Sequence, residues 1–206
     1  GGGTIDGCTN NAPVVSKAST ATDITVGTWY YRVSGVVTYT NVSIQNCENK
    51  ANGDITVSGD VIVARNSDQP GVAVSGVSAY HTTSGTIVNL INRGDINVNT
   101  NMSLHSGLTD VKHGKICIAG VNGYNTRSMR DLQNYGNITI GNTSSDISIA
   151  GNGVHIAGLV TAASGSLGVT NLEKNINKGN ITINRAKLNG RAIKSGNSFA
   201  VSIGGL

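Results

Sequence analysis

The chain has 206 residues, of which 13% are charged and 4% are aromatic, and its formal net charge is +4. So few charges exclude long solvent-exposed helices, and the scattered lysines and arginines lack the dense basic patch and stacking aromatics of a nucleic-acid-binding surface. No apolar run reaches the roughly 18 residues that a membrane-spanning helix needs. The 28 glycines, the 2 prolines and the frequent Val, Ile, Thr, Ser and Asn favour β-structure.

Two short motifs alternate along the whole chain with a common period. The first is a strand-like apolar string that ends in Gly followed by Val or Leu, at 31–36, 72–77, 116–121, 154–159 and 201–206. The second begins with Asn and continues through Gly, Asp or Asn, and Ile, at 49–57, 92–98, 134–140 and 177–183. The glycines of the second motif, at 53, 94, 136 and 179, advance by 41, 42 and 43 residues. Two interleaved motifs with one period indicate stacked supersecondary units.

Each repeat contains three short segments of alternating residues, separated by turn residues. In one repeat they are Val72–Val77, Ile87–Asn92 and Asp95–Val98, followed by a long return of variable sequence. We predict that they are three faces of one coil, and that equivalent faces stack as parallel strands. The predicted fold is all-β, a right-handed parallel β-helix of about five three-sided coils of 41–43 residues. Residues 1–206 then form one repeat domain, divided near 1–40, 41–80, 81–124, 125–163 and 164–206.

Stacked coils bring one residue of each repeat into a column. Asparagine recurs at the corner of every repeat, where stacked amides can donate to one neighbouring coil and accept from the other. We therefore predict a structural amide ladder of Asn10, Asn49, Asn92, Asn134 and Asn177. An inward aliphatic ladder is predicted for Ile55, Ile96, Ile138 and Ile181.

The first segment of each repeat also presents an outer side. Outward positions are predicted for Ala73, Cys117, His155 and Ser202. A stacked row just after this segment is expected from the shared register of Tyr39, Tyr80 and Tyr124. The corner glycines 53, 94, 136 and 179 fit a position that needs a positive φ.

The three cysteines match no zinc or redox spacing. Cys8 and Cys47 occupy equivalent inward positions of adjacent repeats, at a Cα separation of about 5 Å that is within disulfide reach. Parallel in-register geometry often misaligns the Cβ vectors, so we favour stacked free thiols, with a disulfide as the alternative. Cys117 is expected to be unpaired and more accessible.

The paired motifs resemble a known class of repeat. A string ending in Ala/Ser/Gly-Gly-Val/Leu, paired with Asn-x-Gly-Asp/Asn-Ile-Thr-Val, is similar to the GLUG-type repeats of large secreted and surface-anchored bacterial proteins. Ile203-Gly204-Gly205-Leu206 is nearest to the GLUG string itself, while the other copies read Ser-Gly-Val or Ala-Gly-Val/Leu. The resemblance implies an extracellular or cell-surface protein, such as an adhesin, a surface filament or the stalk of a larger enzyme.

No catalytic residue, metal site or cofactor is predicted. A glycosidase needs two carboxylates facing one cleft, whereas Asp54 and Asp95 share a register that becomes Asn in the next two repeats. The four histidines, at 81, 105, 113 and 155, supply no convergent ligand set. The aromatic cluster Trp29-Tyr30-Tyr31 is the candidate ligand-binding site, because such rings stack on sugar faces; alternatively, it covers the core of the first coil.

We predict an extracellular structural or adhesive β-solenoid, with a carbohydrate-binding or polysaccharide-degrading β-helix as the alternative. Both ends of such a solenoid expose unpaired strand edges. The chain is therefore expected to be a fragment or subunit, covered at assembly ends such as Ile203–Leu206 by flanking repeats or by copies joined head to tail in a filament. Surface glycans or host proteins are further expected partners, without nucleic acid or a membrane span.

Overall fold

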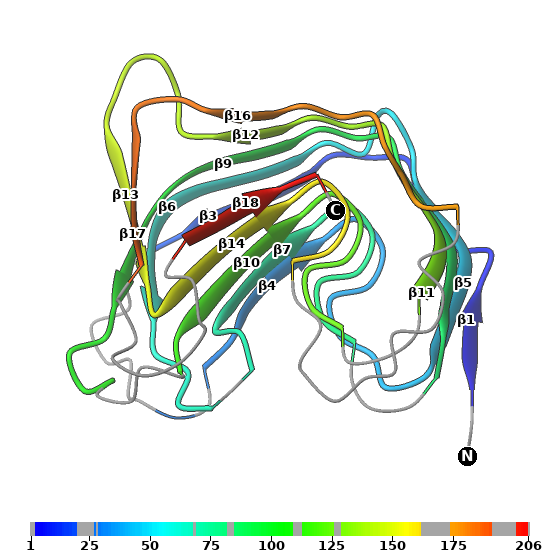
Figure 1. The fold of residues 1–206 in the computed structure, drawn as a ribbon, viewed down its shortest axis with the longest axis horizontal. Helices are drawn as coiled ribbons and strands as arrows, with labels where there is room; N and C mark the ends of the chain where they lie inside the picture. The colour runs from blue at the N-terminus through cyan, green and yellow to red at the C-terminus, as the bar shows by residue number, and fades with distance from the viewer. Residues whose placement is uncertain are drawn as a thin grey trace.

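The computed structural model describes residues 3–19, 27, 29–67, 69–81, 85–108, 113–125, 129–161, 174–190 and 201–205. Every helix or strand assigned among these residues is a β-strand, and all of their strand pairs are parallel. The strands form three sheets (Figure 1). This part of the chain is therefore a parallel β-helix, as the repeat period predicts. It contains no helix long and apolar enough to cross a membrane.

Each sheet takes one strand, or a split pair of strands, from every coil. Sheet 1 contains β1 (Thr4–Asp6), β2 (Thr9–Asn10), β5 (Ser43–Asn49), β8 (Ile87–Asn92), β11 (Met129–Asn134) and β15 (Ile176–Asn177). Sheet 2 contains β4 (Tyr31–Ser34), β7 (Val72–Ser75), β10 (Lys115–Ala119), β14 (Gly153–Ala157) and β18 (Val201–Gly204). Sheet 3 contains β3 (Val14–Ala18), β6 (Ile55–Val63), β9 (Ile96–Leu104), β12 (Ile138–Ile140), β13 (Ile147–Gly151), β16 (Ile181–Ile183) and β17 (Ala186–Gly190).

The chain passes through sheets 1, 3 and 2 in that order, and the described strands make five such coils. Coil 1 runs from β1 to β4, coil 2 from β5 to β7, coil 3 from β8 to β10, coil 4 from β11 to β14 and coil 5 from β15 to β18. In Figure 1, sheet 1 lies on the right, sheet 3 crosses the top, and sheet 2 runs through the middle.

Sheet 3 is longer than the sequence motif predicts. β6 and β9 pair over nine residues, so the strand continues past Val98 into the predicted return. The reason is a second run of inward apolar residues, such as Val61 and Met102, which extends the core. Coil 4 breaks this strand: Val98 and Met102 are four positions apart, whereas their partners Ile140 and Ile149 are nine apart. The extra residues lie in the loop 141–146 between β12 and β13, at the upper left of Figure 1.

Two apolar clusters fill the coils. The larger lies between sheets 2 and 3, and the smaller lies between sheet 1 and the turns that follow sheet 2. The isoleucines of the predicted aliphatic ladder pair with one another in the larger cluster. Ile55, Ile96 and Ile138 are completely buried, and Ile181 in the last coil is partly exposed.

The tyrosine row is confirmed, and it corrects the predicted outer side of sheet 2. Tyr39 stacks on Tyr80 and Tyr80 on Tyr124, with ring centroids 5.8 and 5.2 Å apart. Tyr80 and Tyr124 form a third small apolar cluster with Cys117. Cys117 and Ala73 are therefore buried rather than exposed, because the turns after sheet 2 fold back and bring the tyrosine row over its outer side.

The predicted positive φ of the corner glycines is wrong. Gly53, Gly94, Gly136 and Gly179 are absent from the residues with positive φ. Close backbone approach explains glycine here instead, since a Cβ added at Gly136 would lie 2.0 Å from the carbonyl oxygen of Gly94. At Gly179 the corresponding distance, to the oxygen of Gly136, is 1.9 Å. No side chain fits between these stacked corners.

Positive φ occurs instead in a column within sheet 1 that the sequence analysis did not identify. In successive coils it contains Gly7, Asn46, Asn89, Asp131 and Lys174, with φ between 52° and 66°. Register skips this position: Gln45 pairs with Val88 and Cys47 with Leu90. Each coil thus carries one left-handed residue at this position without a shift in register, and Gly, Asn and Asp are the residues that tolerate this conformation best.

Lys174 is the one long side chain in this column, so replacing it by Gly is expected to stabilise the protein. Removing a strained left-handed Lys should raise the free energy of unfolding by about 0.5–1 kcal/mol, or the melting temperature by a few degrees. The control is Lys187→Gly within β17, where glycine weakens a strand and the shift should have the opposite sign. Thermal unfolding of both variants is the measurement; a destabilised Lys174→Gly would contradict the strain.

Candidate functional site

Three tyrosine rings, two exposed ones from coil 1 and the buried Tyr80 from coil 2, surround one guanidinium group. The Cζ atom of Arg32 lies 3.9 Å from the ring centroid of Tyr30, 4.2 Å from that of Tyr80 and 5.1 Å from that of Tyr39. Arg65 lies 4.2 Å from the same Tyr30 ring. Burial lowers the pKa of Arg32, and the neighbouring tyrosines oppose this shift. Arginine nonetheless stays charged, so these contacts are cation–π interactions.

The three predicted binding residues do not share one environment. Trp29 is 52% exposed and Tyr30 is 37% exposed, both at the surface. Tyr31 instead packs against the main core, and its hydroxyl forms a 2.6 Å hydrogen bond with that of Ser16. All three line a small hollow of about 100 Å³.

The structure adds residues that the sequence analysis missed at this place. Tyr39 is 53% exposed and, with Trp29, Tyr30, Arg32 and Arg65, completes what we call the aromatic–arginine cluster. Arg32 directly follows the aromatic triplet, which could have signalled its role. Arg65 carries no such signal, because only coil stacking brings it to Tyr30. Exposed rings beside cations can bind a sugar face or an acidic group.

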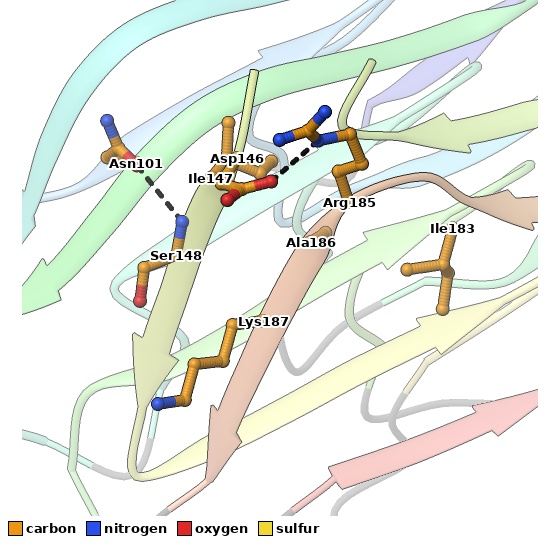
Figure 2. Close-up of a pocket in the computed structure, with 8 residues that line it drawn as sticks. All are labelled: Asn101, Asp146, Ile147, Ser148, Ile183, Arg185, Ala186 and Lys187. Carbon is orange, nitrogen blue, oxygen red and sulfur yellow. Dashed lines mark hydrogen bonds and ion pairs between the residues drawn. The ribbon is translucent and has the colours of Figure 1, made fainter. Parts of the chain in front are cut away.

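A second hollow, of about 550 Å³, lies where coil 4 has its additional loop (Figure 2). It is lined by Asn101 on β9, Ser148 on β13 and Lys187 on β17, and by an ion pair in which Arg185 Nε lies 2.6 Å from Asp146 Oδ1. The pair lowers the pKa of Asp146 and raises that of Arg185. In Figure 2 the Lys187 side chain lies away from this pair. The hollow offers an amine, a hydroxyl and an amide to a polar ligand.

The acidic residues that share a register, Asp54 and Asp95, accept hydrogen bonds from backbone amides. Asp54 Oδ1 accepts a 2.9 Å hydrogen bond from the amide of Asp95, and Asp95 Oδ1 accepts a 2.7 Å bond from the amide of Asn137. Each of these side chains thus caps the corner of the following coil. Among the described residues, no group of three or more His, Cys, Asp or Glu side chains is placed to hold a metal ion.

The cysteines are all free thiols, and their accessibility differs from the prediction. Cys8 is exposed, whereas Cys47 and Cys117 are buried. Burial raises the pKa of Cys117 to about 11, and burial also raises that of Cys47. The prediction that Cys117 is the more accessible thiol is therefore wrong, because the tyrosine row covers it.

We expect a thiol reagent to label Cys8 in the native protein and to leave the other two unmodified. The thiolate is the reactive form of cysteine. Burial disfavours the thiolate of Cys47 and Cys117 and also keeps the reagent away from both sulfur atoms. Mass spectrometry of the protein labelled at pH 7.5 measures this, and labelling in denaturant, where all three should react, is the control. Modification of Cys117 as fast as Cys8 under native conditions would contradict the buried position.

The predicted asparagines form one hydrogen-bonded column with a single direction. In each of the first four coils, Nδ2 donates to Oδ1 of the next asparagine at 2.8–2.9 Å. The same Nδ2 also donates to a carbonyl of its own corner, such as Gly136 O at 2.9 Å. Asn49, Asn92 and Asn134 are buried, so the ladder satisfies groups that the corner would otherwise leave unpaired.

The axial end at coil 5 exposes apolar side chains. Ile183 and Ile203 are exposed there, although their partners in coil 4, Ile140 and Ile156, are buried. Of the predicted assembly end, Ile203–Gly205 lies in or beside β18, and Leu206 lies outside the described residues.

Comparisons of this chain with protein-family models, with curated proteins and with solved structures find no match.

Proposed function

We propose that the chain is a structural β-solenoid segment of an extracellular or cell-surface protein, acting as a stalk or adhesive element that extends by stacking coil on coil. The observation that carries this proposal is the asparagine column, in which every described ladder bond joins one coil to the next. Asparagine side chains, which often bind ligands in other proteins, here hold adjacent coils together. Such nearest-neighbour stacking suits a rigid spacer of repeating units.

The surface location is supported by the resemblance of the two motifs to GLUG-type repeats of large bacterial surface proteins. Exposed isoleucines at the end of coil 5 support contact with flanking repeats or with copies of the chain. If the chain is adhesive, surface glycans or host proteins are its further binding partners.

Two measurements test this function. Antibodies against the chain should bind intact cells of the organism that encodes it, and external protease should remove that signal while a cytoplasmic marker stays intact. The purified chain should leave a panel of polysaccharides at their original size. Antibody access only after lysis would overturn the surface location, and depolymerisation of any polysaccharide would overturn the structural role.

A second candidate function is carbohydrate binding at the aromatic–arginine cluster, favoured by the exposure of Tyr39 beside Arg32 and of Trp29 in the hollow that Tyr30 also lines. Titration with acidic oligosaccharides, followed by Trp fluorescence, is the test, because Trp29 is the one tryptophan of the chain. Binding should be lost in Tyr39→Ala. It should persist in Tyr135→Ala, which removes another ring beside an arginine, at 4.8 Å from Arg93. An unchanged spectrum at all saccharide concentrations would exclude this function.

A further inference from the structure

We infer that the two axial ends of this solenoid are not equivalent: coil 5 is shaped to receive a flanking coil of the same repeat, and coil 1 is closed to one. This inference rests on the structural role proposed above and specifies its partner. Three independent features carry it, namely a glycine column, the direction of the amide ladder, and the corner of coil 1.

The glycine column follows sheet 2. A Cβ added to any of its first four members would lie within 2.6 Å of a carbonyl oxygen of the following coil, at Gly35, Gly76, Gly120 and Gly158. It would also meet the corner asparagine of that coil, as Gly120 meets Asn134 Cγ at 2.5 Å. The following coil therefore forces glycine at these positions.

Gly205 occupies the same column in coil 5, beside the residue pair Ala157 and Gly204. Among the residues that the structure describes, an added Cβ there would meet only Asn177 Nδ2, at 3.8 Å. Nothing in the described structure thus requires glycine at 205. A further coil stacked on coil 5 would require it, for the reason that holds at Gly158.

The hydrogen-bonding groups at the coil 5 corner point to the same partner. Asn134 Nδ2 donates two bonds, to Gly136 O and to Asn177 Oδ1. Asn177 Nδ2 donates only the first of these, to Gly179 O at 3.2 Å, and so has one N–H left for a following asparagine. Asn137 Oδ1 accepts from the backbone amide of Asn180 at 3.1 Å, and Asn180 repeats that capping position for a next coil.

Coil 1 departs from this pattern on the opposite face. Asn10 Nδ2 donates to Ala12 O at 2.8 Å just as Asn92 Nδ2 donates to Gly94 O, so Ala12 takes the place of the corner glycine. At Gly94, an added Cβ would lie 2.5 Å from the carbonyl oxygen of the preceding coil. The methyl group of Ala12 fills that space, and a coil stacked before coil 1 would collide with it.

Pro13 removes a hydrogen bond at the same corner. It takes the position of Asp54, since Val14 pairs with Ile55. In later coils the backbone amide at this position donates to the preceding coil, as Asp95 N donates to Asp54 Oδ1. Proline has no N–H and cannot make this bond.

The partner is therefore a coil whose corner reads Asn-x-Gly-Asp or Asn-x-Gly-Asn, stacked on coil 5. The first coil of a second copy does not meet this description, because it would bring Ala12 and Pro13 against Gly179 and Asn180. The partner of coil 5 is therefore a flanking repeat and not an identical copy joined head to tail.

The test adds one coil to either end and measures thermal unfolding. In the first fusion, residues 122–159 are repeated directly after Leu206, which places their Asn and Gly over Asn177 and Gly179. We expect the melting temperature to rise by at least about 5 °C, and amide exchange in β18 to slow, because a cohesive interface is gained. A matched control repeats the same segment with its corner Asn and Gly both replaced by Ala, and should show no rise.

In the second fusion, residues 42–80 are placed ahead of Gly1, and no rise is expected. The same fusion carrying Ala12→Gly and Pro13→Asp should recover the rise, measured against the double variant without the added coil. Equal gains at both ends of the unaltered chain, or no gain after Leu206, would overturn the inference. So would head-to-tail oligomers of the unaltered chain in sedimentation. These readouts concern stability and assembly, so they are distinct from the cell-surface and polysaccharide tests of the proposed function.

Discussion

Replacing Ile138 by Asp is expected to lower the free energy of unfolding by about 4 kcal/mol or more, enough to unfold a marginally stable protein at 37 °C. Ile138 is completely buried in the larger core cluster, where it pairs with Ile96 in the coil before and Ile181 in the coil after. A carboxylate at this position would lose its hydration, and the described side chains of this cluster are apolar. Urea-induced unfolding followed by circular dichroism measures the loss.

The control for this prediction is Thr139→Asp, one residue further along β12. Thr139 pairs with Asn97 and Thr182, and its side chain lies on the partly exposed side of the strand. Because water can still reach a carboxylate there, the expected loss is about 1 kcal/mol or less. Equal effects of the two substitutions would show that the inward and outward sides of β12 are misassigned.

Replacing Asn134 by Asp is expected to cost about 3–5 kcal/mol, although the two side chains have nearly the same shape. Asn134 Nδ2 donates to Gly136 O at 2.9 Å and to Asn177 Oδ1 at 2.8 Å. A carboxylate oxygen placed there would face two oxygens with no proton to offer either, in a position that is almost completely buried. The lost ladder bond joins coil 4 to coil 5, so coil 5 should lose protection from amide exchange first.

Asn137→Asp is the matched control, since Asp54 and Asp95 hold this register in earlier coils. The Oδ1 atom of Asn137 accepts from the amide of Asn180, and a carboxylate oxygen accepts this bond equally well. Its weak 3.2 Å bond to Asp95 Oδ1 is replaced by repulsion between two carboxylates, but water reaches this partly exposed register, where Asp54 and Asp95 already neighbour each other, so the expected cost is about 1–2 kcal/mol. A larger effect at 137 than at 134 would contradict the proposed role of the buried ladder.

The period and the alternation of the sequence were enough to predict the coil, the asparagine and isoleucine columns and the tyrosine row. A residue type that recurs once in every repeat at the same register comes to lie in a column when the coils stack. The asparagines at 49, 92 and 134 and the tyrosines at 39, 80 and 124 could be placed this way. The aromatic triplet also led to coil 1, where Trp29 and Tyr30 lie at the surface.

Contacts between residues of different columns became visible only in the three-dimensional structure. Cys117 has an outward position in its strand, yet it is buried because the turn carrying Tyr124 folds over it. Arg65 reaches Tyr30 only through coil stacking, and no local pattern predicts that distance. Strand β9 continues past Val98 because later apolar residues, such as Met102, pack into the same core.

The corner glycines show most directly what the sequence could not predict. Their spacing was visible in the sequence, but the reason why glycine is required was not, since positive φ and close backbone approach both favour glycine. The carbonyl oxygen of Gly94, 2.0 Å from an added Cβ at Gly136, decides for close approach. Close approach between coils also explains why Ala12 prevents a coil from stacking before coil 1, and why Gly205 suits a coil stacked after coil 5. Whether a glycine is needed depends on the atoms of the neighbouring coil, and those are known only once the coils are stacked.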